Sequence, residues 1–343
     1  MSAPTPRAVR PPRLGFLGTG WIGRHRLEAV AASGAAEIAA IADPVAASAD
    51  AARSLAPDAR VTGSLDELLD AGLDGVVIAT PSALHAEQAV AALERGLAVF
   101  CQKPLGRSAE ETARVVEAAR GADRLLGVDL SYRHVAAARR VRELVSSGEL
   151  GDVFAAELVF HNAYGPDKPW FYDPTLSGGG CVIDLGIHLV DLALWTLGHP
   201  AVSGASARLF AGGMPLDGRT DVVEDYAVAT LDLEGGAVAR LACSWNLSAG
   251  RDAVIGAEFF GTRGSAALRN VDGSFFDFTA TCAHGTSEAT IARPPDAWGG
   301  RAAVAWARRL ARHPGYDDGA ERLVELAAAV DAIYGRRAMV PTA

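Results

Sequence analysis

Two short segments of this 343-residue chain carry ionisable side chains where a proton could be moved. The first places Lys103 directly before a proline, and the second places Asp184 and His188 four residues apart, after glycines at 178–180. An ammonium can polarise a carbonyl oxygen or hold an alkoxide, and an imidazole titrates near neutrality. Together these groups suit the interconversion of an alcohol and a ketone.

The neighbouring residues restrict where each of these side chains can point. Pro104 biases the backbone of Lys103 toward an extended conformation, whereas a lysine without such a setting is usually a solvated surface residue. On a helix, Asp184, His188 and Asp191 share one face. Asp184 could orient His188 or hold a substrate hydroxyl; the competing interpretation is a helix-start carboxylate beside a half-buried histidine. A zinc site is not expected, because no cysteine or second histidine stands at ligand spacing.

A glycine pattern upstream suits the pyrophosphate of a dinucleotide. It follows an apolar run and opens a helical stretch, so its backbone can approach a phosphate at the positive end of a helix. The residues expected to contact the cofactor here are Gly18, Gly20, Trp21, Ile22 and Gly23. Asp43 ends the next apolar run, where a carboxylate accepts hydrogen bonds from ribose hydroxyls and repels a 2′-phosphate. We therefore expect NAD, with NADP the less favoured cofactor. The competing interpretation is a surface turn and an aspartate cap.

Residues that follow two further predicted strands are also expected to contact the dinucleotide. Thr80, Pro81 and His85 follow the third apolar run, and Gln102 with Lys103 follows the fourth. Ligands of parallel sheets bind at the carboxyl ends of the strands, so these residues are also expected at the cofactor. A plain strand-to-helix turn capped by Ser82 would give the same pattern.

The first third of the chain alternates apolar runs with amphipathic stretches. The runs cover residues 14–17, 37–42, 75–79, 97–101 and 124–128. Helices are expected between them, with Ser64 and Ser108 as N-caps in capping boxes. Continuous apolar strands between helices predict a doubly wound, Rossmann-type parallel sheet.

After about residue 129 the pattern changes. Helices are expected over about 135–147 and 317–334, and a strand over 153–160. Alternating stretches within 201–291, such as the pair turned by Glu234-Gly235-Gly236, predict antiparallel hairpins. The fold class is therefore α/β plus α+β, with an antiparallel sheet that carries helices on one side in the second half. We predict a flexible tail at 1–12, a dinucleotide-binding domain at 13–129 and a substrate-binding domain at 130–343.

Composition limits the possible partners. The formal charge is −9, and no run of five basic residues occurs, which argues against nucleic acid and anionic membranes as partners. No segment reaches the roughly 20 apolar residues of a membrane helix. Four distant cysteines without a CxxC pair fit a reducing cytoplasm.

With these residues assembled, the chain resembles the glucose–fructose oxidoreductase and inositol dehydrogenase family (Gfo/Idh/MocA) over residues 13–340. The glycine loop, the Thr80 to His85 segment, the Lys103-Pro104 pair and the Gly180 to His188 segment stand in the family's order. The resemblance implies NAD(P)-dependent chemistry at a sugar or cyclitol hydroxyl carbon. It implies Lys103, Asp184 and His188 as the catalytic set, with His188 as acid–base. It also implies that the antiparallel sheet of the second domain is large and open, and that it joins a homo-oligomer, a dimer or tetramer.

One residue departs from the family pattern. The family usually has glutamate before the lysine, where this chain has Gln102. An amide can still bond a hydroxyl of the nicotinamide ribose, but it does not counterbalance the charge of Lys103.

The substrate pocket is expected to combine polar and aromatic groups. Lys103, Asp184 and His188 are expected to contact the substrate as well as to catalyse. The further candidates are Tyr132, Arg133, His161 and Trp170, with Asn162, Tyr164 and Asn246 beside them.

Three functions remain open at this point. The first is an NAD-dependent sugar or cyclitol dehydrogenase, the second a biosynthetic ketosugar reductase with a free or nucleotide-linked substrate. The third is a cofactor-binding sensor that has lost turnover.

Overall fold

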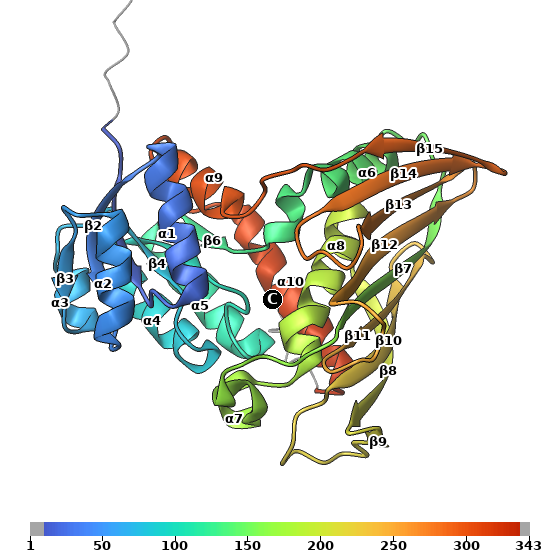
Figure 1. Cartoon of the computed structure of the whole chain (residues 1–343), viewed down its shortest axis with the longest axis horizontal. Coiled ribbons are helices and arrows are strands. Elements are labelled where there is room, and N and C mark those ends of the chain that lie inside the picture. Colours follow the sequence, from blue (N-terminus) through green and yellow to red (C-terminus); the bar gives the residue numbers. More distant parts are fainter. Residues whose placement is uncertain (1–9, 337–343) are drawn as a thin grey trace, which may run out of the picture.

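The computed structural model describes residues 10–336, which form two sheets with helices packed on and between them (Figure 1). Residues 1–9 of the predicted tail lie outside this range. The first sheet is parallel throughout, in the order β3-β2-β1-β4-β5-β6. Its strands are β1 (Arg13–Leu17), β2 (Glu37–Ala42), β3 (Arg60–Thr62), β4 (Gly75–Ile78), β5 (Ala98–Cys101) and β6 (Leu126–Val128).

Helices cover both faces of this sheet. Residues of α1 (Trp21–Ser33) and α2 (Ala46–Leu55) share a buried cluster on one face. The other face carries α3 (Leu65–Leu69), α4 (Ser82–Glu94) and α5 (Ala109–Ala122). The predicted caps are present, because Ser64 Oγ accepts from the N–H of Glu67 and Ser108 Oγ from that of Glu111. The doubly wound parallel sheet is therefore confirmed.

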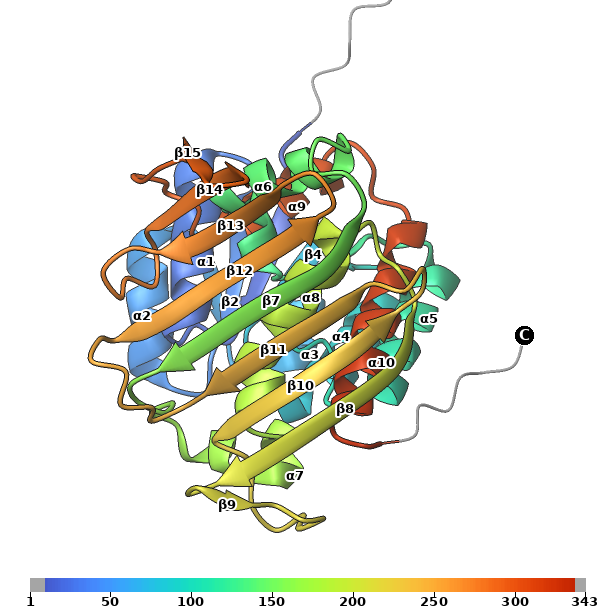
Figure 2. The same ribbon diagram turned by 90° about the vertical axis from the view of Figure 1, so that its right-hand side faces the viewer.

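The second sheet is large and open, in the order β15-β14-β13-β12-β7-β11-β10-β8-β9 (Figure 2). The described pairs are antiparallel except for β7 with β11, which run parallel at its centre. The strands are β7 (Val153–Asn162), β8 (Val202–Ala211), β9 (Met214–Pro215), β10 (Tyr226–Leu233), β11 (Val238–Ser244), β12 (Ala253–Gly261), β13 (Ser265–Asn270), β14 (Phe278–His284) and β15 (Ser287–Ala292).

One face of the second sheet packs on helices that lie between it and the first sheet (Figure 1). These are α6 (Ala136–Ser146), α8 (Ile187–Thr196) and α10 (Glu321–Ile333). A short π-helix (Val182–Gly186) leads directly into α8, and α7 (Pro174–Ser177) precedes it. The stretch 174–196 is long and apolar enough to cross a membrane by length and composition, contrary to the sequence expectation, but 83% of its most apolar window is buried inside the fold. This burial indicates that the stretch belongs to the core of the fold.

One helix was not expected from the sequence. Helix α9 (Arg301–Leu310) comes from the range predicted for the second domain, yet it packs beside α1 on the first sheet. Its Trp306 ring lies 5.6 Å from the ring of Phe100 on β5. The polypeptide thus returns to cover the first sheet after building the second.

Candidate active site

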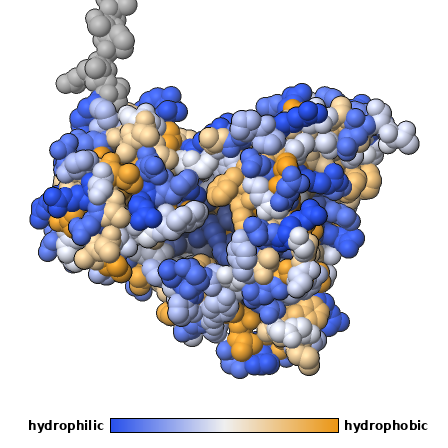
Figure 3. Space-filling view, in the orientation of Figure 1, coloured by the Kyte–Doolittle hydropathy of each residue, from blue (hydrophilic) through white to orange (hydrophobic). Residues whose placement is uncertain are grey.

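A cavity of about 690 Å³ lies where the two halves meet. The space-filling surface is hollowed at this place (Figure 3). One wall comes from the carboxyl ends of strands in the first sheet, as expected for a parallel sheet. The other comes from the π-helix, α8 and loops of the second half. The lining includes Gly20, Trp21, Ile22, Arg26, Thr80, Pro81, Ser82, His85, Gln102, Lys103, Asp129, Ser131, Tyr132, Lys168, Trp170, Phe171, Asp184, His188, Phe275, Phe276 and Trp298.

The glycine loop is built by close backbone contacts. Gly18 has a φ of +80°, and a Cβ there would lie 2.7 Å from the carbonyl oxygen of Ala79. A Cβ on Gly23 would lie 2.1 Å from the carbonyl oxygen of Gly18. Gly20, by contrast, has open space beside it and lines the cavity. The loop therefore leaves room for a phosphate at the start of α1.

Asp43 braces this loop from outside the cavity. Its Oδ2 accepts from the backbone N–H of Thr19 at 2.6 Å, and its Oδ1 accepts from the N–H of Val45. Its expected contact with the adenosine ribose stays a prediction.

His85 joins two of the predicted cofactor segments. Its ring is 1% exposed, with Nδ1 2.6 Å from the carbonyl oxygen of Pro104 and Nε2 2.7 Å from that of Thr80. Burial lowers the pKa of this imidazole. Since both ring nitrogens face backbone carbonyls, the geometry gives His85 the role of tying the β4–α4 turn to the Lys103-Pro104 segment.

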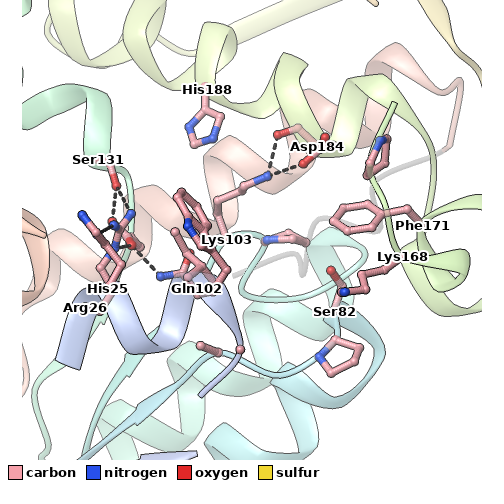
Figure 4. Close-up of a pocket in the computed structure, with 18 of the residues that line it drawn as sticks. His25, Arg26, Ser82, Gln102, Lys103, Ser131, Lys168, Phe171, Asp184 and His188 are labelled. Carbon is pink, nitrogen blue, oxygen red and sulfur yellow. Dashed lines mark hydrogen bonds and ion pairs between the residues drawn. The ribbon is translucent and has the colours of Figure 1, made fainter. Parts of the chain in front are cut away.

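Lys103 and Asp184 form an ion pair across the cavity (Figure 4). Lys103 Nζ donates to Asp184 Oδ1 and to the backbone oxygen of Asp184, both at 2.6 Å. The indole Nε1 of Trp245 donates to Asp184 Oδ2 at 3.0 Å. Asp184 therefore positions the ammonium, whereas the sequence suggested that it would orient His188 or hold a substrate hydroxyl.

His188 enters the cavity from α8, in an aromatic setting (Figure 4). Its ring lies 5.0 Å from that of Tyr132 and 6.3 Å from that of Phe160. Its Nδ1 is buried without a hydrogen-bond partner in the part of the chain that the structure describes. Burial, and secondarily the charges of Lys103 and Arg26, hold the pKa of His188 well below its ordinary value. The imidazole is therefore neutral at neutral pH and able to accept a proton.

The three glycines before Asp184 pack closely against neighbouring segments. A Cβ on Gly180 would lie 1.9 Å from the backbone oxygen of Glu224, and one on Gly179 would lie 2.1 Å from the hydroxyl of Tyr334. The buried carboxylate of Glu224 accepts from the N–H groups of Gly180 and Val182 and from Tyr334. This buried anion thus caps the start of the helix that carries the site.

The expected substrate residues divide into two groups. Tyr132 and Trp170 line the cavity. Arg133 does not, because its guanidinium forms a two-pronged ion pair with Asp191. His161 points away from the helices, since its neighbours Phe160 and Leu158 occupy the buried face of β7. Asn162, Tyr164 and Asn246 also stand outside the lining.

Sequence reasoning missed a buried polar cluster in the wall of the cavity. Asp129 accepts from Arg26, Gln102 and Ser131. Asp129 directly follows β6, so the strand-end rule that found Lys103 could have found it too. The helical Arg26 carries no such signal.

A potential metal-binding group also went unnoticed in the sequence. Ligand atoms of Glu149, Cys282 and His284 lie within 4.8 Å of one another. These residues are outside the cavity lining, so they do not bear on its chemistry.

Comparison with known proteins places this architecture. Residues 13–130 match the family model "Oxidoreductase family, NAD-binding Rossmann fold", and residues 138–267 match "GFO/IDH/MocA C-terminal domain". Inositol 2-dehydrogenase 3 of Saccharopolyspora erythraea is 32% identical, over 75% of this chain and 72% of that protein. The chain belongs to the Gfo/Idh/MocA family.

A second curated relative and one solved structure are also similar to this chain. The D-glucoside 3-dehydrogenase of Escherichia coli K12 is 30% identical over 57% of this chain and 58% of its own length, so the alignment spans under two thirds of that relative. The structure of GenD2 from gentamicin A biosynthesis, in complex with NAD, superposes with a TM-score of 0.80 at 24% identity. That superposition covers 98% of this chain and 96% of the other, and it shows a shared fold.

Proposed function

We propose that this protein is an NAD-dependent dehydrogenase that oxidises a ring hydroxyl carbon of a sugar or cyclitol. The observation that carries the proposal is the Lys103–Asp184 ion pair facing His188 in the cavity beside the glycine loop. Bound NAD would supply the hydride acceptor, and the loop and the start of α1 fit its pyrophosphate. Family membership supports the same class, since relatives in it are named as sugar and inositol dehydrogenases.

In this mechanism the protein accepts the proton of the substrate hydroxyl and stabilises charge on its oxygen. Neutral His188 accepts the proton of the substrate hydroxyl. The Lys103 ammonium, positioned by Asp184, stabilises the negative charge that develops on that oxygen. The low pKa of His188 keeps the imidazole in its base form at neutral pH, which is the form that the oxidation of an alcohol requires.

The proposal is tested by NADH formation with free sugars, inositols and 1,5-anhydrosugars. Lys103→Ala should lower kcat about 10²–10³-fold on the best substrate. The Kd for NAD should change little, because the glycine loop is untouched. Lys103→Arg is the matched variant, since it keeps the charge opposite Asp184 and tests whether geometry or charge is required.

The other outcomes identify the alternatives. Turnover of a ketosugar with NADH, without oxidation of any alcohol, would indicate the reductase. NAD binding without turnover of any compound would indicate a sensor. Equal loss of kcat and NAD affinity in Lys103→Ala would make Lys103 a cofactor residue and contradict the mechanism.

Three finer features belong to the same proposal. We prefer NAD to NADP because the carboxylate of Asp43 stands next to the glycine loop. We propose a homo-oligomer joined through the open face of the second sheet. A cytoplasmic location rests on the cysteine composition alone.

A further inference from the structure

A buried acid organises the cavity wall beside Lys103. Asp129 is 1% exposed, and its Oδ2 accepts from Arg26 Nε and from Gln102 Nε2, each at 2.5 Å. Its Oδ1 accepts from the hydroxyl of Ser131. All four residues line the cavity, and Figure 4 shows Gln102 between Arg26 and Lys103.

This arrangement decides which end of the Gln102 amide faces the ligand. An ionised carboxylate can only accept hydrogen bonds, so the amide must turn its NH₂ group toward Asp129. The carbonyl Oε1 then points the other way. This oxygen makes no hydrogen bond to a described residue, and it is not fully buried. Oε1 is therefore open to the cavity as an acceptor.

Asp129 also explains why residue 102 is an amide. A glutamate there would place a second carboxylate within hydrogen-bond distance of the first, and two such groups cannot both ionise. Arg26 could not neutralise both, because its Nη1 meets His25 and its Nη2 meets Ser131. A buried acid at position 129 therefore requires a donor at position 102.

We propose that Asp129 is a positioning residue that holds the Gln102 amide with Oε1 facing the bound nicotinamide dinucleotide as a hydrogen-bond acceptor. The inference rests on the proposed function only in taking the ligand to be a nicotinamide dinucleotide. Gln102 follows β5, beside β4 and on the same sheet edge as the glycine loop, which is where a dinucleotide extends. Asp184 and His188 stand on the facing wall, which is left to the substrate.

The test compares Gln102→Glu, Asp129→Asn and the exchanged pair Gln102→Glu/Asp129→Asn. The readouts are the Kd for NADH, from fluorescence titration, and the melting temperature of the protein without ligand. Gln102→Glu should raise the Kd about tenfold or more, because the acids at 102 and 129 compete for one proton. The exchanged pair restores one acid and one amide, and should recover most of the affinity.

The difference in melting temperature between Gln102→Glu and wild type should depend on pH, which a substitution that only disturbs packing would not cause. In Gln102→Glu the shared proton raises the folded-state pKa of the pair above that of the unfolded chain, so the folded state binds more protons. Stability relative to wild type should then fall as pH rises from about 5 to about 8. The other charged or titratable groups around residues 102 and 129 are Arg26, Lys103 with its partner Asp184, and the imidazoles of His25, His134 and His188. These are common to all the variants.

A matched control is available on α4. Gln88 accepts from the hydroxyl of Thr80 at 2.6 Å and lies outside the cavity lining. Gln88→Glu should therefore shift the melting temperature by an amount that does not change with pH.

Two results would overturn the proposal. One is a Gln102→Glu variant with wild-type affinity for NADH and a melting difference that is constant with pH. The other is an exchanged pair that is no better than Gln102→Glu, including the case in which both fail to fold. Neither readout uses a sugar, so failure to find a substrate would count against the proposed function and leave this inference standing.

Discussion

At the scale of single residues, His188 combines burial with two neighbouring positive charges. Both effects disfavour the imidazolium, so the pKa of His188 is held well below its ordinary value. The base form should persist as pH falls. We expect kcat/KM for oxidation to stay level from pH 8 to below about 6.5, the ordinary pKa of histidine. A pH–rate profile checks this, and an acid limb centred above 6.5 would contradict it.

The same shift has a consequence for stability. Below about pH 6.5 the unfolded chain binds a proton at residue 188 that the folded chain does not bind, so this residue contributes a loss of stability as pH falls. His188→Gln should therefore lose less stability than wild type between pH 7.5 and pH 5.5, measured by urea unfolding. His313→Gln, at an exposed position, is the control.

Residue types located the cavity-lining residues better than they predicted the contacts between those residues. Lys103, Asp184 and His188 were all predicted, and all line the cavity. Their pairing was not predicted, because nearness in sequence suggested Asp184 with His188, whereas folding brings Lys103 across 81 residues to Asp184. Arg133 shows the same limit, since an arginine beside a strand end reads as a ligand until its carboxylate partner Asp191 is seen.

At the scale of elements, the start of the π-helix depends on one buried carboxylate. Glu224 satisfies two backbone N–H groups and the hydroxyl of Tyr334, although burial raises its pKa. Glu224→Ala would leave these donors buried without an acceptor. We expect a loss of about 3 kcal/mol in the free energy of unfolding. A lower kcat should accompany it, because Asp184 lies on this helical turn.

Urea unfolding of Glu224→Ala checks the expected loss. The matched control is Glu143→Ala, which removes an exposed carboxylate on α6 that is paired with Arg140. A surface pair of that kind contributes under about 1 kcal/mol. Equal effects of the two substitutions would show that Glu224 is not a cap.

Elements with strong local signals were predicted, and those without were not. The capping serines and the glycine-flanked helices gave clear boundaries. The three-residue strand β3 is too short for a periodic pattern, and helix α9 was overlooked. The π-helix was not predicted; at its start the backbone of Gly180 meets Glu224, a contact between distant segments that no local pattern reveals.

At the scale of the whole molecule, the second sheet has a face without helices in the described structure (Figure 2). Side chains alternate along its strands, so Ala227, Ala229 and Leu231 are buried while Val228 and Thr230 point outward. A shallow groove on this face is lined by apolar groups such as Val159 and Val228 and by charges of both signs. A patch carrying both signs can pair with its own copy about a two-fold axis.

We therefore expect a second copy of the chain to cover this face. Val228→Lys would place a charge in the centre of such an interface, and should lower the mass measured by light scattering to that of the monomer. NADH binding should persist, because the cavity lies on the other side of the sheet. Val61→Lys, at an exposed valine on β3, should leave the mass unchanged. A wild-type protein that is monomeric at micromolar concentration, or an oligomer whose mass is unchanged by Val228→Lys, would contradict this expectation.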